Sequence, residues 1–356
     1  MNRIFNKLTQ PQAQYKIFNN PEVLPKAWYI TLKCKQLRKL EVKAVIIGGQ
    51  KLILYRGKSG QAYALDAFCP HMGTSLAIGS VVNEHIRCYF HHWCFDGEGQ
   101  CVHIPAQPEK STQIKTTGYA VKEAYGYIWV YPDAHFNAPL LVPPDLANDE
   151  IVFSMDKPVR ALCHHHIRMI NGLDAQHLKF IHKLDIHLKL ELHEETERIN
   201  FTLSGKIPNR SLGQKLARFL LGPSYSYSMS YAQGSVASLT LMQDVYFIKP
   251  EWSWPRLHMI FAYLPGQDGI SSYSYPIFIT KKRSTLAGKI LAKFLLFAVK
   301  RAYYHLRDDD NKIYDNIRFN TKNLLPIDET LIKYINYVEG LEPSAWSKQE
   351  RKIHEQ

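Results

Sequence analysis

Cys69-Pro-His71 and Cys88-Tyr-Phe-His91, with sixteen residues between them, are the two stretches that decide the fold of the first part of this chain. Two thiolates and two imidazoles in two short loops can hold a two-metal cluster asymmetrically, with sulfur on one metal and nitrogen on the other. Neutral histidines in place of two cysteines remove negative charge and raise the reduction potential, to roughly −150 to +300 mV. A structural zinc site is the alternative, because it uses the same ligand types. Zinc loops usually pair C-x-x-C segments, so a histidine two residues after the first cysteine favours the cluster.

The sequences around these ligands carry a family resemblance. CPHMG at 69–73 and CYFHHWCFDGEGQC at 88–101 resemble the cluster-binding loops of Rieske [2Fe–2S] proteins, and the similarity extends from about Trp28 to about Pro132. It implies a Rieske [2Fe–2S] cluster with the four ligands Cys69, His71, Cys88 and His91. Thr74 and Phe90 stand where respiratory-chain members carry a disulfide, so the pattern is that of the ferredoxin and oxygenase branch. His92 departs from the glycine that most relatives have before the tryptophan of this loop.

Length and composition allow two domains. The chain has 356 residues, 44 basic and 32 acidic, for a net charge of +12. The N-terminus has no apolar signal region and no stretch reaches the length of a membrane span, which predicts a cytoplasmic protein with free thiols. The positive charge favours anionic partners such as an acidic ferredoxin. Nucleic acid is not expected, because no recognition motif is present.

The order of apolar runs predicts an α+β chain. We expect an N-terminal arm at residues 1–26, an all-β domain at 27–135 and a second domain at 136–356 after a proline-rich connector. Short strands are expected in the first domain at 44–47, 51–55, 62–65 and 127–131. Alternating strands are expected in the second at 199–203, 225–231, 236–246, 257–263 and 271–278. Helices are expected at 171–181, 286–306 and 311–319.

A second constellation, Asn171-x-x-Asp174-x-x-His177-x-x-x-x-His182, lies in the second domain. Two imidazoles and a carboxylate on one face of a mononuclear Fe(II) leave positions open for O₂ and substrate. On an ideal helix His182 would lie well around the cylinder from His177. The helix must therefore kink or end near Phe180 if both histidines bind one metal.

A Rieske domain followed by this motif resembles the α-subunit of Rieske non-heme iron oxygenases over almost the whole chain. The resemblance implies a helix-grip (START-like) catalytic domain with a curved antiparallel sheet, and iron held by His177, His182 and a distant carboxylate. It also implies that Asp174 bridges to a cluster histidine of a neighbouring subunit in a homotrimer. Asn171 belongs to the same motif.

The distant carboxylate is sought in Arg307-Asp308-Asp309-Asp310, which is followed by Asp315. Family members carry an acidic pair with another acid five residues later, which favours Asp310 as the ligand and leaves Asp309 as the runner-up. The alternative interpretation is a helix N-terminus whose first turn is stabilised by acids. Both can hold, since three aspartates exceed one ligand position.

The resemblance implies a terminal oxygenase that uses O₂ to hydroxylate, desaturate or demethylate an organic substrate. Electrons would come from NAD(P)H through a separate reductase, with or without a ferredoxin, because the chain has no nucleotide-binding fingerprint. Weak similarity to steroid hydroxylases and desaturases points to a bulky hydrophobic substrate. The alternative is a Rieske-type electron-transfer protein without oxygenase activity, which leaves the second motif unexplained.

Two other features need interpretation. His164-His165-His166 is expected on a strand, where successive side chains point to opposite faces, and so predicts no third metal. Residues 281–301 and 215–221 are basic and apolar at helical spacing. They fit two core-facing helices with solvated lysines, or peripheral contact with an anionic membrane.

Overall fold

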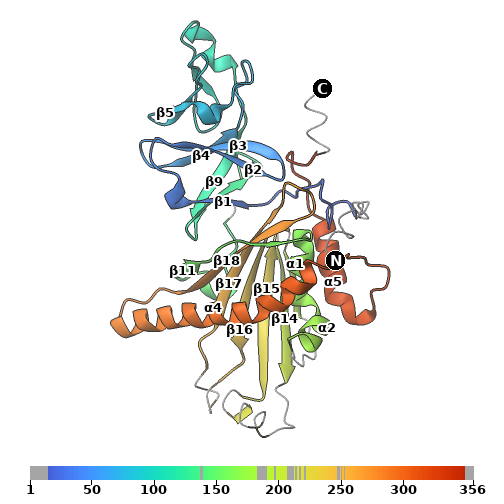
Figure 1. The fold of residues 1–356 in the computed structure, drawn as a ribbon. Coiled ribbons are helices and arrows are strands. Elements are labelled where there is room, and N and C mark those ends of the chain that lie inside the picture. The colour runs from blue at the N-terminus through green and yellow to red at the C-terminus, as the bar shows by residue number, and fades with distance from the viewer. Residues whose placement is uncertain are drawn as a thin grey trace, which may run out of the picture.

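The computed structural model describes residues 15–136, 139–182, 191–195, 198–206, 222–246 and 253–348, with single positions (212, 215, 218, 219, 249 and 251) between them. Within these residues the chain forms a β-rich N-terminal part above a larger part in which helices pack on a long antiparallel sheet (Figure 1). The predicted α+β fold class is confirmed. Most of the predicted basic segment 215–221 lies outside the described residues.

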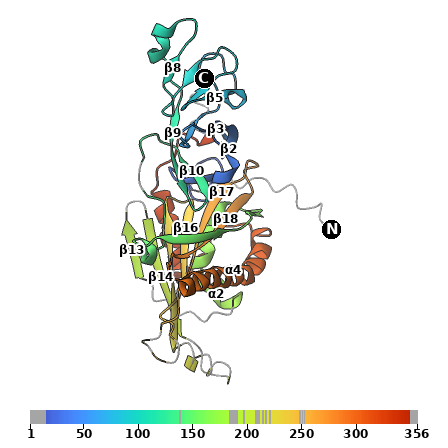
Figure 2. The same ribbon diagram turned by 90° about the vertical axis from the view of Figure 1, so that its left-hand side faces the viewer.

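The N-terminal part consists, as far as it is described, of two antiparallel sheets. The larger has the strand order β1-β10-β9-β4-β3-β2 and the smaller β5-β6-β7-β8. The strands are β1 (Tyr29–Lys33), β2 (Val42–Ile47), β3 (Gln50–Arg56), β4 (Ala62–Asp66), β5 (Ser80–Val82), β6 (His85–Arg87), β7 (Cys94–Phe95), β8 (Cys101–His103), β9 (Gly118–Ala124) and β10 (Tyr127–Tyr131). The small sheet lies at the end of the molecule farthest from the second part (Figure 2). It carries the two Cys/His loops at that end.

The second part is built on one antiparallel sheet with the described order β11-β18-β17-β16-β15-β14-β13, and β12 pairs with β18. Its strands are β11 (Ile151–Met155), β12 (Val159–Ala161), β13 (Glu191–Glu195), β14 (Arg198–Lys206), β15 (Ser224–Ala232), β16 (Val236–Gln243), β17 (Leu257–Pro265) and β18 (Ser272–Lys281). Along β14, Ile199, Phe201 and Leu203 are fully buried while their neighbours are partly exposed. This period of two is the pattern from which the strand was predicted.

The helices on this sheet are α1 (His165–Ile170), the 3-10 turn η5 (Asn171–Leu173), α2 (Ala175–Phe180), α4 (Leu286–Tyr314) and α5 (Glu329–Glu339). The prediction of separate helices at 286–306 and 311–319 is wrong: α4 is continuous through the aspartates and ends at Tyr314. No residue between 306 and 311 is proline or glycine, so nothing interrupts the helical hydrogen bonding. Helix α5 was not predicted.

Residues near both ends of the described part of the chain are buried in the cores. Ile17 and Phe18 are fully buried against α1 and α5 in the second part, and Trp346 packs on Tyr29 in the first. These contacts tie the two parts together. Among the described residues, no helix is long and apolar enough to cross a membrane.

Candidate metal centres and substrate pocket

The first candidate centre lies at the tip of the small sheet. Cys69 and Cys88 are 3% and 1% exposed, whereas the rings of His71 and His91 lie at the surface with their centroids 4.6 Å apart. His71 also stacks on Trp93 at 4.2 Å. The buried cysteine sulfurs and the surface histidine nitrogens could thus bind different irons of an asymmetric two-iron cluster.

The loop backbones hold these side chains in place. Cys69 donates its N–H to Thr74 and accepts one from Gly73, and Cys88 donates to the carbonyl of Trp93 at 2.8 Å. His92, which departs from the glycine of most relatives, has φ +57°. His92 therefore adopts the left-handed backbone conformation that glycine adopts freely, at some cost in strain.

The thiols fit a metal rather than a disulfide. Burial, with a smaller contribution from the neighbouring Cys88, raises the pKa of the Cys69 thiol to about 11. A positively charged metal is what converts such thiols to thiolates. All six cysteines, which are all among the described residues, are free.

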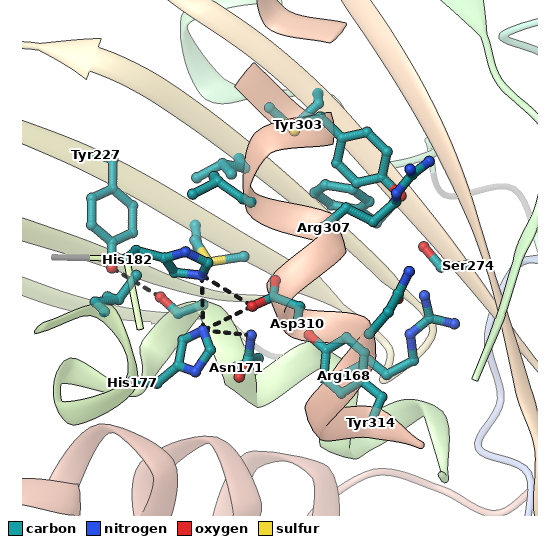
Figure 3. Close-up of a pocket in the computed structure, with 18 of the residues that line it drawn as sticks. Arg168, Asn171, His177, His182, Tyr227, Ser274, Tyr303, Arg307, Asp310 and Tyr314 are labelled. Atoms are coloured by element: carbon teal, nitrogen blue, oxygen red, sulfur yellow. Dashed lines mark hydrogen bonds and ion pairs between the residues drawn. The ribbon is translucent and has the colours of Figure 1, made fainter. Parts of the chain in front are cut away.

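The second candidate centre combines three side chains from two segments. Nε2 of His177 lies 2.9 Å from Nε2 of His182, and both nitrogens lie 3.0 Å from Oδ1 of Asp310 (Figure 3). Metal–ligand bonds of about 2.1 Å at right angles put neighbouring donor atoms about 3 Å apart. The three donors therefore fit one face of an octahedral metal ion.

The helix break predicted near Phe180 is confirmed. Asp174 is the N-cap of α2, where its Oδ1 accepts the backbone N–H of His177 at 3.0 Å. The helix ends at Phe180, and the chain then turns so that the ring of His182 returns to that of His177. Asn171 completes this side of the site with Nδ2 3.0 Å from Nε2 of His177.

The three aspartates of α4 have different surroundings. Asp308 pairs with Arg307 and Asp309 with Lys312, both at the surface, whereas Asp310 faces the two histidines. Burial raises the pKa of Asp310, but hydrogen bonds to His177 and His182 outweigh it, so its pKa is below the usual value. The interpretation of these acids as a helix N-terminus is wrong, because they lie in the last turns of α4, where the helix dipole disfavours negative charge.

Neighbouring contacts fix the two segments to one another. Oδ1 of Asp315, at the end of α4, accepts the backbone N–H of Leu162 just before α1. Tyr227 on β15 donates its hydroxyl hydrogen to the carbonyl of Gly172 at 2.9 Å. These bonds hold the histidine segment and the Asp310 helix against the same sheet.

A cavity of about 140 Å³ adjoins the three donors. Its wall is largely apolar and includes Leu178, Met229, Leu239, Leu241, Met259 and Phe261. Arg168, which the sequence analysis did not single out, also lines it. Arg168 is 6% exposed, donates through Nη1 to the carbonyl of Val159, and lies over the rings of Tyr263 and Tyr314. Its Nε has no hydrogen-bond partner among the described residues.

The strand expected at His164-His165-His166 is wrong, and with it the reason given for the absence of a third metal. The segment is the start of α1 and not a strand, and the ring centroids lie 4.2 to 4.6 Å apart. Their donor atoms could surround an ion, but no carboxylate of the described residues joins the group. A divalent cation there would be a buried, uncompensated charge, which is costly. We therefore interpret the three rings as neutral core histidines; His166 stacks on Phe18.

Comparisons with known proteins agree with this geometry. The family described as Rieske [2Fe-2S] domain matches residues 27–122. Cholesterol 7-desaturase nvd 1 of Ciona intestinalis is 36% identical over 166 residues, 46% of this chain and 35% of that protein. Aminopyrrolnitrin oxygenase PrnD of Pseudomonas fluorescens is 29% identical over 181 residues, 46% of this chain and 47% of that protein. The chain thus spans less than half the length of these relatives.

A solved structure extends the likeness to the whole fold. The oxygenase–ferredoxin complex of carbazole 1,9a-dioxygenase matches with a TM-score of 0.64 at 16% identity, over 92% of this chain and 93% of that chain. The likeness therefore covers both the sheet-rich N-terminal part and the part that carries the three donors.

Proposed function

We propose that this chain is the α-subunit of a Rieske non-heme iron oxygenase, the terminal component that uses O₂ to hydroxylate or desaturate a bulky hydrophobic substrate; the matched Rieske domain and the shared fold support this. Its cofactors are a Rieske [2Fe–2S] cluster and a mononuclear non-heme iron. When bound, these groups supply one-electron storage and O₂ activation. The observation that carries the proposal is the convergence of His177, His182 and Asp310 beside an apolar cavity.

We assign the cluster ligands to Cys69, His71, Cys88 and His91, and the iron ligands to His177, His182 and Asp310. In this assignment Asp310 contributes the single negative charge of the iron site. The contact of the Asp309 carboxylate with Lys312 at the surface supports the choice of Asp310 over Asp309. Asn171 would border the iron, since its Nδ2 lies 3.0 Å from the ligating Nε2 of His177.

We further propose that the working enzyme is a ring of copies, as a homotrimer. The cluster loops lie at the end of the molecule farthest from the iron-site helices (Figures 1 and 2). The two centres of one copy are therefore far apart, and an electron would pass more readily between neighbouring copies. Asp174, partly exposed at the start of α2, would contact a cluster histidine of a neighbouring copy. Electrons would arrive from an NAD(P)H-dependent reductase, directly or through an acidic ferredoxin. The free thiols suit a reducing compartment, the cytoplasm.

The pocket supports a substrate with a large apolar body and one hydrogen-bond acceptor. The aliphatic and aromatic wall would hold the body, and the buried guanidinium of Arg168 would meet the acceptor. A fused-ring alcohol or ketone has this chemistry, and relatives named cholesterol 7-desaturases match 46% of this chain. We therefore propose a sterol-like substrate.

The test begins with metal analysis of anaerobically prepared protein. We expect about three irons and two acid-labile sulfides per chain. Asp310→Ala is expected to lose about one iron while keeping its sulfide and its visible absorption. Asp309→Ala, the matched control on the same helix, is expected to keep all the metal. Zinc in place of iron, or full iron in Asp310→Ala, would contradict the ligand assignment.

Activity is measured separately with a surrogate reductase, NADH and a panel of sterols. We expect substrate-dependent O₂ consumption and an oxidised product, both absent in Asp310→Ala. The alternative, an electron carrier without oxygenase activity, predicts a reducible cluster and no mononuclear iron. Iron analysis therefore separates the two functions even before a substrate is found.

A further inference from the structure

Helix α4 has a second apolar face that does not pack on the protein. Ala292, Leu295, Val299 and Tyr303 are buried against the sheet. On the outer side, Leu286, Ile290, Phe294 and Phe297 recur at helical spacing and are 77%, 61%, 60% and 67% exposed. We call these four residues the outer face of α4. In Figure 1 the first turns of this helix extend past the edge of the sheet, where the described part of the chain leaves them open to solvent.

Basic side chains predominate beside the outer face. The stretch from Lys281 to Arg307 contains eight lysines and arginines and no aspartate or glutamate, and four of the eight pair with carboxylates outside it: Lys281, Lys282, Lys300 and Arg307. Lys289 and Lys293 flank the apolar row on one side, and neither forms an ion pair among the described residues. Arg301, one turn after Phe297, is exposed and continues the same row. Large exposed apolar side chains flanked by Lys289 and Lys293 complement a surface that is apolar inside and anionic outside.

We propose that the outer face of α4 docks on an anionic lipid bilayer, with its four apolar side chains among the acyl chains and Lys289 and Lys293 at the headgroups. A lipid surface fits better than a second copy of the chain, because pairing two such faces would bring two sets of lysines together. The net charge of +12 acts in the same direction.

The same helix leads from the docked face to the pocket. Leu296 and Tyr304 pack against the same buried cluster as Leu239 and Leu241. Tyr303 and Leu306, farther along α4, line the cavity next to Asp310. An apolar molecule leaving the bilayer at the outer face would therefore have the pocket on the same helix, a few turns farther along α4. This second step rests on the proposed function, whereas docking itself does not.

Co-sedimentation of the holoprotein with vesicles tests docking without any turnover. The vesicles are phosphatidylcholine alone, or phosphatidylcholine with phosphatidylserine. We expect binding to the anionic vesicles at low salt that weakens as salt is added. Replacing Lys289 and Lys293 together by Ala should weaken it roughly 30-fold, at about tenfold per 1.4 kcal/mol and about 1 kcal/mol per basic side chain.

Phe294→Ser with Phe297→Ser tests the apolar part and should weaken binding by at least about tenfold. Leu325→Ser with Ile327→Ser is the matched control, since those side chains are 57% and 49% exposed away from the outer face. Circular dichroism and iron content verify that each variant is folded.

Three outcomes would overturn the proposal. The first is absence of wild-type binding to anionic vesicles at low salt, and the second is equal binding by the Phe294/Phe297 variant. The third is self-association of wild-type protein that this variant abolishes while vesicles are not bound, since the face would then be covered by a second copy. None of these outcomes changes the iron analysis, so failure here is distinguishable from failure of the proposed function.

Discussion

The buried histidines at the start of α1 predict that the catalytic part loses stability in mild acid. Burial lowers the pKa of His164 to about 3, and the pKa values of His165 and His166 are also well below 6.5. In the unfolded chain all three titrate near 6.5. The folded state therefore binds fewer protons between these values, and stability falls as pH drops below about 6.5.

The size of the effect follows from the shift. Each pH unit below 6.5 costs about 1.4 kcal/mol per histidine, which gives about 2 kcal/mol for His164 at about pH 5. His164 is only partly covered, so about 1 to 2 kcal/mol is expected. His164→Asn removes this titration and keeps an N-cap acceptor, because the Nδ1 of His164 accepts the N–H of His166 and asparagine is a preferred N-cap.

The assay is urea unfolding of the metal-loaded protein, followed by tryptophan fluorescence from about pH 5 to pH 8. The variant should match wild type near pH 7.5 and lose about 1 to 2 kcal/mol less on going to pH 5. Exposed His305→Asn is the control and should leave the wild-type slope unchanged. Parallel pH profiles for His164→Asn and wild type would refute the claim that this imidazole is neutral in the fold.

Three other substitutions test the pocket. A Cβ at Gly172 would lie 2.2 Å from Sδ of Met229, so Gly172→Ala should push that side chain into the cavity and cost about 1 to 3 kcal/mol in thermal unfolding. Tyr227→Phe removes the hydrogen bond to the carbonyl of Gly172 and should cost about 1 kcal/mol, checked by denaturant titration with iron content unchanged. Arg168→Met should weaken binding of a ligand that bears an acceptor by about 10- to 150-fold, the equivalent of about 1.5 to 3 kcal/mol, with no change for the ligand lacking that group. Equal losses for both ligands would show that Arg168 acts only through packing.

The features that were predictable from sequence depend on local chemistry. Strands such as β14 and β15 were found because one face is buried and the other is not, which imposes a period of two. The end of α2 was predicted because two rings can meet one metal only if the helix stops between them. Helix α5 could have been found, since Leu331, Tyr334, Ile335 and Val338 have helical spacing and are buried.

The features that were missed depend on distant partners. No local pattern shows that Arg168 turns toward a cavity formed by β15, β16 and β17, because the residues around it come from strands that begin more than fifty positions later in the chain. The three histidines were assigned to a strand because their spacing alone does not distinguish a strand from a short helix. The continuity of α4 was missed because three consecutive aspartates suggested a new helix start. The local sequence does not show that distant histidines supply Asp310 with its partners.

The three donors come from places in the chain separated by more than a hundred residues, since His182 and Asp310 are 128 positions apart. An ion held between them would act as a cross-link that closes a long loop, and such links favour the folded chain by limiting the unfolded one. Iron starvation would then do more than stop turnover: it would loosen the last turns of α4 from α2 and expose the chain to proteases. Cellular levels of the protein should accordingly track iron supply even where its substrate is absent.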